Sequence, residues 1–479
     1  MSIVKNYIYN TVYQIMMLLI PLITMPYITR IFTKDQIGVQ VYTLTIVTYF
    51  MLFGMLGMQL YANRQVAYIR DNKDVLTKTF WSLYATQIVT CLISLVLYYL
   101  YVGFLVNNYV MIYIIQGLNI LCVLLDVSWL FMGLEDFKKV VIRNTIVKLV
   151  GLGAIFIFVR SSEDLLLYII LTILVNILGM ISMWFYVPKY VGKISVDFKI
   201  VKSTIKPLLK LFLPQIATQV YLLLSKTMIG ALSSTAEVAL YEYSQKIVRM
   251  ILALITSIGV VLMPRVSNII AKGRHDEVAK IIEKTFKFVS YIAMPMAIGL
   301  MCISQILVSW FFGEDFKEAG ILTSVSSVII IAVSWANIIG IQYLIAIKQE
   351  NKYTVSILIS AGVNLLMNAI LIKAYGALGA VISLVVAEFV GVIIQFFLVR
   401  KELNVKNMLL GVVKYFVAAI IMGIIIIPIG IIIKNGIIAN IIQATLGAIV
   451  YGLIMFIIKD EVQKEIFNGI ISIVKKKAL

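Results

Sequence analysis

Three charged residues, Glu242, Lys246 and Arg249, lie within an otherwise apolar stretch, "ALYEYSQKIVRMIL" at 239–252. Their i, i+4 and i+7 spacing places them on one face of a helix. Each charge at the centre of a bilayer costs roughly 2.5–3.5 kcal/mol on insertion scales. Glu242 either forms a simple ion pair with Lys246 or takes part in function, and in both cases net positive charge remains. We therefore expect Lys246 and Arg249 to bind an anionic ligand.

Polar residues follow the same pattern in other apolar stretches. Gln215, Gln219 and Lys226 form one stripe at i, i+4 and i+11, and Arg30 closes the first apolar stretch. Such amides often only hold helices together, at roughly 0.6–2 kcal/mol per contact, but Lys226 is a third intramembrane cation and again favours an anion. Lys148 either faces a cavity or extends to the membrane surface. The predicted substrate-binding residues are Arg30, Gln215, Gln219, Lys226, Lys246 and Arg249.

Three carboxylates in apolar stretches are candidates for coupling or gating: Asp126, Glu242 and Glu388. Protonation or sodium binding at these groups would change the charge of a cavity. Transport would then be driven by protons, sodium or the membrane potential. The three cysteines and the single histidine show no metal-ligand spacing, so we expect no metal and no cofactor.

The composition identifies the surrounding solvent as lipid. Hydrophobic residues make up 62% of the 479 residues and charged residues 13%, whereas soluble chains are nearer half apolar and a quarter charged. We therefore predict an all-α polytopic membrane protein with about 14 transmembrane helices of about 20 residues each. The predicted spans are 8–30, 38–60, 80–106, 109–133, 140–160, 164–187, 208–231, 237–264, 286–312, 319–347, 353–374, 377–399, 409–433 and 436–458.

The basic residues alternate along these spans. Most of the 41 Lys and Arg residues fall in every second loop, with the richest clusters at 188–210 and 265–287. Because cytoplasmic loops carry excess Lys and Arg, both termini are predicted to be cytoplasmic. This topology accounts for the net charge of +18, so no nucleic-acid partner is expected.

The chain resembles itself at an offset near 200 residues. "KTF" occurs at 78–80 and at 284–286, and "GLEDFKKV" corresponds in position to "IKQENKYT". The repeat predicts two parallel six-helix lobes that alternate access to a central site. The predicted boundaries are 1–198 and 199–404 for the lobes, and 405–479 for an extra helix pair with a cytoplasmic tail.

Three motifs resemble the polysaccharide-transporter (Wzx-like) flippases of the multidrug/oligosaccharidyl-lipid/polysaccharide exporter superfamily: "PLITMPYITRIFTKDQIGVQVY" at 21–42, "DVSWLFMGLEDFKKVVIRN" at 126–144 and "LFLPQIATQVYLLLSKTMIGAL" at 211–232. The resemblance implies a fourteen-helix, two-lobed transporter, and we expect a monomer in the bacterial cytoplasmic membrane. It implies as substrate an undecaprenyl-diphosphate-linked oligosaccharide, a precursor of capsule, exopolysaccharide or teichoic acid. It also places Arg30 and Lys226 in or near the central cavity, and suggests that 409–458 shelters the lipid tail.

Two alternatives remain open. A multidrug or ion antiporter of the same superfamily would favour a more acidic or aromatic cavity than this cationic pattern indicates. An integral-membrane glycosyltransferase or glycan polymerase would need catalytic residues on sizeable outer loops, and the predicted outer loops are short. No glycine-rich nucleotide-binding loop occurs. We therefore expect a transporter rather than an enzyme, with membrane lipids and the lipid-linked oligosaccharide as its partners.

Overall fold

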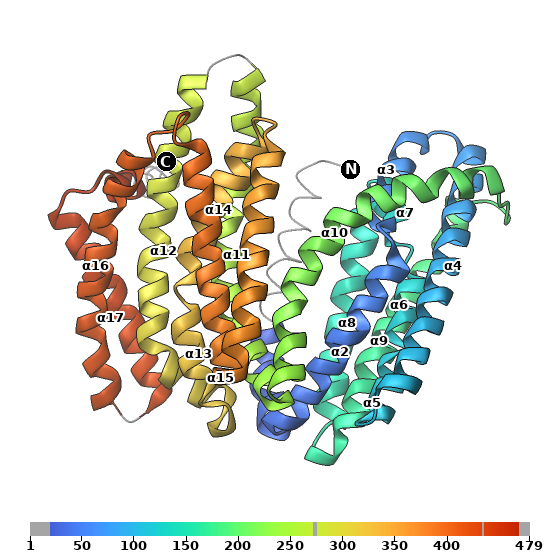
Figure 1. Cartoon of the computed structure of the whole chain (residues 1–479), viewed down its shortest axis with the longest axis horizontal. Helices are drawn as coiled ribbons and strands as arrows, with labels where there is room; N and C mark the ends of the chain where they lie inside the picture. Colours follow the sequence, from blue (N-terminus) through green and yellow to red (C-terminus); the bar gives the residue numbers. More distant parts are fainter. Residues whose placement is uncertain (1–19, 272–274, 434, 469–479) are drawn as a thin grey trace, which may run out of the picture. The chain divides into compact units, whose positions relative to one another are not determined.

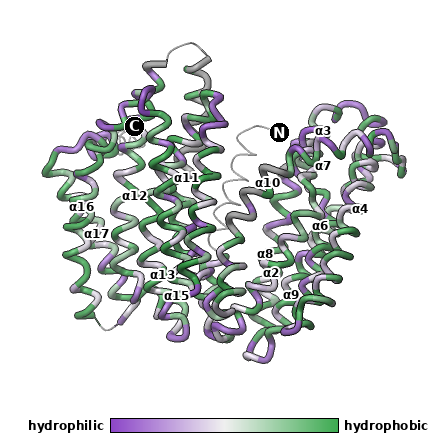
Figure 2. Tube along the Cα trace, viewed as in Figure 1, coloured by the Kyte–Doolittle hydropathy of each residue, from purple (hydrophilic) through white to green (hydrophobic). Residues whose placement is uncertain are grey.

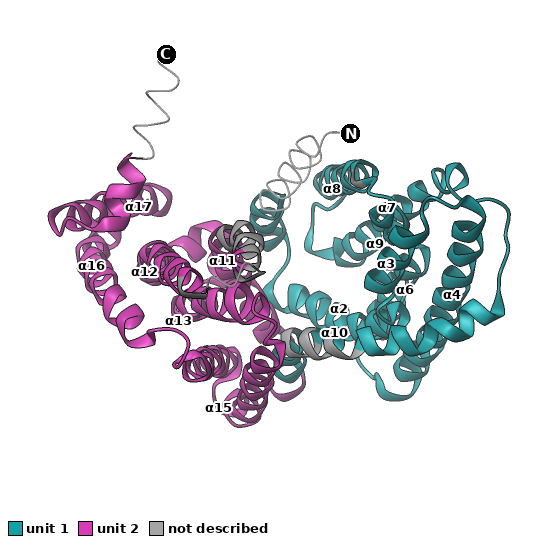
Figure 3. Cartoon of the chain, turned by 90° about the horizontal axis from the view of Figure 1, so that it is seen from above, with its two compact units in different colours: residues 1–230 teal, residues 231–479 magenta. Residues whose placement is uncertain are grey.

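The computed structural model describes residues 20–271, 275–433 and 435–468. Within these ranges the regular structure is helical and contains no strand, which confirms the predicted all-α class. The chain forms two compact units, Met1–Gly230 and Ala231–Leu479, coloured separately in Figure 3. The predicted lobe boundaries stay a prediction.

Unit 1 is a bundle of helices joined by short connections (Figure 1). Residues 20–31 are helical and lead into α2, which begins with a capping box between Thr33 and Gln36. The helices that follow are α2 (Lys34–Met55), α3 (Met58–Ile69), α4 (Lys73–Leu105), α5 (Val110–Gln116), α6 (Asn119–Leu125), α7 (Ser128–Gly133), α8 (Phe137–Phe158), η1 (Ser162–Asp164), α9 (Leu165–Trp184), η2 (Val187–Lys189) and α10 (Phe198–Leu232).

Unit 2 contains the longer helices. They are α11 (Thr235–Ala271), α12 (His275–Phe312), η3 (Glu314–Phe316), α13 (Ala319–Ser326), α14 (Ile329–Ala336), η4 (Asn337–Ile345), α15 (Glu350–Val399), α16 (Val405–Ile432) and α17 (Gly436–Ile457). The segment η4 is a π-helix. The predicted C-terminal pair at 409–458 is helical, because it corresponds to α16 and α17. These two helices pack on each other and on α12.

Helix α15 is a hairpin of two helical arms. Gly376 has φ +55° and interrupts the helix, a conformation that glycine adopts without a Cβ penalty. Gln395 Nε2 donates to Ser356 Oγ at 3.1 Å, and Gly391 lies against Ser360. In each contact the two residues are about equally far from Gly376 along the sequence, so the arms run antiparallel. The carboxylate of Glu237 accepts a hydrogen bond from Ala377 N at 2.8 Å and caps the second arm.

The helices carry the apolar surface that a membrane requires. Within the part of the chain that the structure describes, ten helices are long and apolar enough to cross a bilayer. Figure 2 shows hydrophobic residues along the helices and hydrophilic ones concentrated toward the connections. Large apolar side chains such as Phe104, Ile424 and Ile431 are exposed, as expected for surfaces that contact lipid. The multi-pass membrane class is confirmed, and the count of about 14 spans stays a prediction.

Some predicted spans are more broken than the sequence suggests, among them 319–347, which forms α13, α14 and η4, and 109–133. The stretch 109–133 forms three short helices, α5, α6 and α7, which are separated at Gly117 and at Asp126. Gln87 Nε2 donates to the backbone carbonyls of Val123 and Asp126, at 2.7 and 2.9 Å. This amide compensates the carbonyls released where α6 ends.

Candidate functional site

The charged face of α11 is the best-defined part of the predicted site. Lys246 Nζ lies 3.6 Å from Glu242 Oε1, and their side chains are 36% and 18% exposed. The same ammonium lies 4.6 Å from the centre of the Tyr243 ring. Arg249, one turn further along, is exposed. The predicted grouping of these three residues on one helix face is therefore present in the structure.

The apolar surface of α11 beside the charged face packs into unit 2. Tyr241, Tyr243 and Val248 are buried. The Tyr243 ring lies edge-on to Phe312, with 5.0 Å between ring centres, and also packs on Phe316. This apolar face fixes the rotation of α11. The charged residues consequently occupy the side that unit 2 leaves accessible.

The remaining predicted substrate-binding residues belong to unit 1. Arg30 is exposed, and its Nη1 donates to the carbonyl of Pro26 at 2.8 Å. Gln219 and Lys226 are half-buried on α10, whereas the side chain of Gln215 lies outside the described residues. Next to Lys226, the hydroxyls of Thr227 and Tyr49 lie 2.9 Å apart. Since the six residues are divided between the two units, their convergence on one cavity stays a prediction.

The other two predicted coupling carboxylates occupy different environments. Asp126 Oδ1 accepts a hydrogen bond from Ser128 N at 2.8 Å, so this side chain caps the short helix α7. Glu388 is half-buried on the second arm of α15 and lies within electrostatic range of Tyr353. Asp126 thus has a structural contact that the sequence did not indicate. The coupling role of Asp126, Glu242 and Glu388 stays a prediction.

A cavity between α8 and α9 was missed by the sequence analysis. It has a volume of about 560 Å³ and carries Asp136, Lys138, Lys139 and Arg143 toward one end. Arg143 is only 9% exposed, although it is not among the predicted site residues. The signal that would have revealed it is the i, i+4 spacing of Lys139 and Arg143, because Arg143 lies one turn inside the predicted span 140–160.

The basic end of this cavity contacts the segment that follows α9, through Tyr190. Lys139 Nζ lies 2.7 Å from Asp136 Oδ2, and the Tyr190 hydroxyl donates to the same oxygen at 2.8 Å. Burial disfavours the charged carboxylate, but these hydrogen bonds and the lysine charge outweigh it and lower the pKa of Asp136. The loops that follow α7 and α9, both predicted to be cytoplasmic, therefore meet here.

Lys148 lies at a second, smaller cavity. It is exposed and lines a space of about 100 Å³ together with Arg143, Asn144 and Asn176. Gly179 lines both cavities, and a Cβ at Gly179 would lie 2.2 Å from Val147 Cγ2. Of the two alternatives left open for Lys148, the structure places it at a cavity in unit 1, together with Arg143, Asn144 and Asn176.

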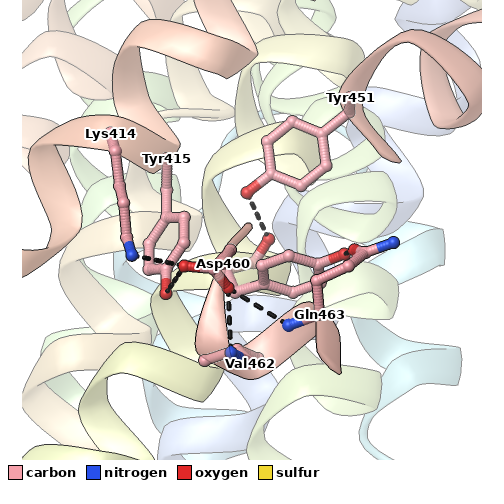
Figure 4. Close-up of polar contacts among 7 residues, drawn as sticks. Lys414, Tyr415, Tyr451, Asp460, Val462 and Gln463 are labelled. Carbon is pink, nitrogen blue, oxygen red and sulfur yellow. Dashed lines mark hydrogen bonds and ion pairs between the residues drawn. The ribbon is translucent and has the colours of Figure 1, made fainter. Parts of the chain in front are cut away.

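A third polar cluster joins α16 to the segment after α17 (Figure 4). Asp460 has a fully buried side chain that pairs with Lys414 Nζ and accepts from the Tyr415 hydroxyl at 3.1 Å. Its other oxygen accepts from the backbone N–H groups of Val462 and Gln463, at 2.9 and 3.1 Å. Burial raises the pKa of Asp460, but the Lys414 contact and the other donors lower it further, so the net shift is downward. This cluster fixes the end of the C-terminal helix pair.

The fold matches that of solved membrane transporters. A solved structure of the lipid II flippase MurJ, in an inward closed conformation, aligns with a TM-score of 0.77 at 15% identity, covering 95% of this chain and 98% of that one. An inward-facing multidrug-resistance MATE family transporter aligns with a TM-score of 0.61 at 11% identity, covering 81% of this chain and 95% of that one. In sequence, the chain is 25% identical to a putative O-antigen transporter of Escherichia coli (strain K12), over 81% of this chain and 94% of the relative.

These findings define the class as a multi-pass transporter of the multidrug/oligosaccharidyl-lipid/polysaccharide exporter superfamily, of the Wzx-like type and not an enzyme. The model of a family described as polysaccharide biosynthesis protein matches residues 3–270. The chain belongs to this family. The family resemblance drawn from the three sequence motifs is confirmed.

Proposed function

We propose that this protein is a flippase that moves undecaprenyl-diphosphate-linked oligosaccharides across the cytoplasmic membrane by alternating access. The family match and the O-antigen transporter relative support a lipid-linked glycan as the substrate class. Capsule, exopolysaccharide and teichoic-acid precursors all carry the same diphosphate. A site that recognises the diphosphate therefore treats these precursors as one substrate class.

The observation that carries the proposal is the position of Arg249. It lies fourteen residues, or about 21 Å of helix, beyond Thr235 at the start of α11, and it is exposed there. A guanidinium facing hydrocarbon at that depth is unfavourable by several kcal/mol. An exposed face lined with water or an anion removes this cost. A diphosphate is a suitable anion because a planar guanidinium binds its oxygens in a bidentate manner.

The neighbouring ion pair does not remove the need for an anion. A partly exposed i, i+4 pair such as Glu242 and Lys246 contributes only about 0.3–0.5 kcal/mol. At 3.6 Å the pair is also loose, so Lys246 can turn toward a ligand at little cost. In this proposal the diphosphate binds Lys246 and Arg249, and Arg30 and Lys226 are further candidate cations for the substrate.

The coupling step belongs to the same proposal. Protonation of Glu242 or Glu388, or sodium binding beside either group, raises the positive charge near the anion and so changes its affinity between transport steps. Asp126 acts at the break between α6 and α7, where a change of its charge would alter the capping of α7. In this proposal the polyprenyl tail remains in lipid while the glycan crosses the membrane through the protein.

The test measures lipid binding to the purified full-length protein by native mass spectrometry. Undecaprenyl diphosphate is compared with undecaprenol, for the wild type, Arg249→Ala and the control Arg400→Ala. Arg400 is also exposed, but it follows α15 and stacks on Phe397 at 3.8 Å from the ring centre. We expect selective binding of the diphosphate that is lost only in Arg249→Ala. Equal binding of both lipids would reject the anion site and favour a multidrug or ion antiporter.

A further inference from the structure

We propose that the cavity between α8 and α9 binds one anionic glycerophospholipid of the membrane. Its phosphate lies at Lys138, Lys139 and Arg143, and one acyl chain follows the apolar walls. The volume of about 560 Å³ is within the range of roughly 300–1,000 Å³ that is typical of small-molecule sites. This lipid is separate from the transported substrate.

Charge favours an anion at one end of the cavity. Lys138, Lys139 and Arg143 supply three positive charges there, and Asp136 supplies one negative charge, which leaves a net charge of about two. Arg143 is almost fully buried, and an ionic hydrogen bond is stronger where water is excluded. Basic pockets between membrane helices on the cytoplasmic side are typical of anionic headgroup sites.

The walls favour an acyl chain over a soluble anion. Ile142, Ile146 and Val150 follow one another at intervals of four residues on α8, and Val175 and Leu178 face them from α9. The α8 stripe covers about 12 Å along the helix, away from the basic end. Four of these five side chains are exposed, all except Val175. A ligand with an anionic head and a long apolar tail covers both parts of this surface.

The surroundings favour a phospholipid as this occupant. The Lys139, Asp136 and Tyr190 contacts hold the headgroup end in place before a ligand binds, which lowers the cost of ordering on binding. Membrane phospholipid is present at far higher local concentration than a polyprenyl carrier. A site of moderate affinity is therefore filled by phospholipid.

The experiment uses the full-length protein in detergent and native mass spectrometry with added phosphatidylglycerol or phosphatidylcholine. Lys138→Gln removes one headgroup charge, and Leu178→Trp places a bulky ring in the apolar groove. The matched controls are Lys193→Gln and Ile181→Trp, because both residues are exposed in the same region but do not line the cavity. We expect preferential retention of phosphatidylglycerol, reduced about fivefold in Lys138→Gln and also reduced in Leu178→Trp.

Three results would overturn the proposal. They are equal retention of the two phospholipids, equal retention by cavity and control variants, and displacement of phosphatidylglycerol by an equimolar amount of undecaprenyl phosphate. Lys138→Arg restores the charge and should restore binding, which separates a charge effect from a folding defect. None of these variants changes a predicted substrate-binding residue, so the result is independent of the flippase proposal.

Discussion

Two of the lysine–carboxylate pairs in unit 2 differ in burial, in separation and in the number of hydrogen bonds that they receive. The Lys414–Asp460 pair has a carboxylate that is 0% exposed and receives hydrogen bonds from a tyrosine and two backbone amides. The Lys246–Glu242 pair is separated by 3.6 Å, and both of its side chains retain access to solvent. The first pair uses its charge to hold helices together, and the second keeps its charge accessible to a ligand. The comparison shows that burial, and not sequence spacing, separates an ion pair that holds the fold together from one that stays accessible.

The largest effect on stability is expected at Asp460. Asp460→Ala removes a helix cap and leaves Lys414 and Tyr415 without their acceptor, which should lower the free energy of unfolding by about 2–4 kcal/mol. Thermal denaturation in detergent measures the change. The control is Glu461→Ala, an exposed carboxylate at the next position, which should change stability by less than about 0.5 kcal/mol. Equal effects of the two substitutions would remove the distinction between the pairs.

Acid should weaken the Asp460 cluster selectively. The pKa of Asp460 in the folded protein is lowered, so its contribution to stability is present above the unfolded value of about 3.9 and is lost as the pH falls through the folded pKa. The difference in melting temperature between the wild type and Asp460→Asn should therefore shrink below about pH 4. A difference that stays constant from pH 7 to pH 3 would contradict this assignment.

An intermediate effect is expected from Tyr415. Tyr415→Phe removes one donor to the buried carboxylate while retaining the ring that packs on Tyr291, with ring centres 5.6 Å apart. The loss of a hydrogen bond to a charged group should lower the free energy of unfolding by about 1.5–3 kcal/mol. The remaining donors to Asp460 compensate part of this loss. Tyr451→Phe is the comparison, because its hydroxyl donates to a neutral carbonyl of Tyr291 at 2.9 Å. It should cost less, and a larger loss for Tyr451→Phe would reverse the ranking of charged over neutral acceptors.

The smallest stability change is expected in the α11 pair, together with a large change in function. Glu242→Gln and Lys246→Ala should each alter the free energy of unfolding by less than about 0.5 kcal/mol, because the pair is partly exposed. Lys246→Ala should nevertheless weaken binding of undecaprenyl diphosphate, and Glu242→Gln should strengthen it by removing a negative charge near the anion. A Lys246→Ala protein that unfolds readily would place this pair in the structural class of Lys414 and Asp460.

The sequence predicted the positions of the helices well because long apolar runs determine where a chain enters lipid. The reversal between the spans 353–374 and 377–399 is present at Gly376. The breaks inside 109–133 were not predicted, because an apolar run does not show where a polar side chain such as Gln87 will replace helical hydrogen bonds.

Side-chain partners were less accessible to prediction. The charged face of α11 followed from spacing within one helix. The Asp460 cluster joins Tyr291, Lys414 and Asp460. These residues lie far apart in the sequence, so no local pattern connects them. Arg143 was not predicted as a site residue, since its burial between α8 and α9 depends on packing that no local pattern records.

The hairpin of α15 limits how this protein can change in evolution. Contacts between its arms, such as Ser356 with Gln395 and Gly391 with Ser360, are placed symmetrically about the turn at Gly376. Inserting one residue between Ser360 and Gly376 would rotate the two parts of that arm by about 100° relative to each other. It would move one polar side chain out of this shared interface. Insertions in one arm are therefore expected to be removed by selection, whereas substitutions that preserve the length of both arms are tolerated.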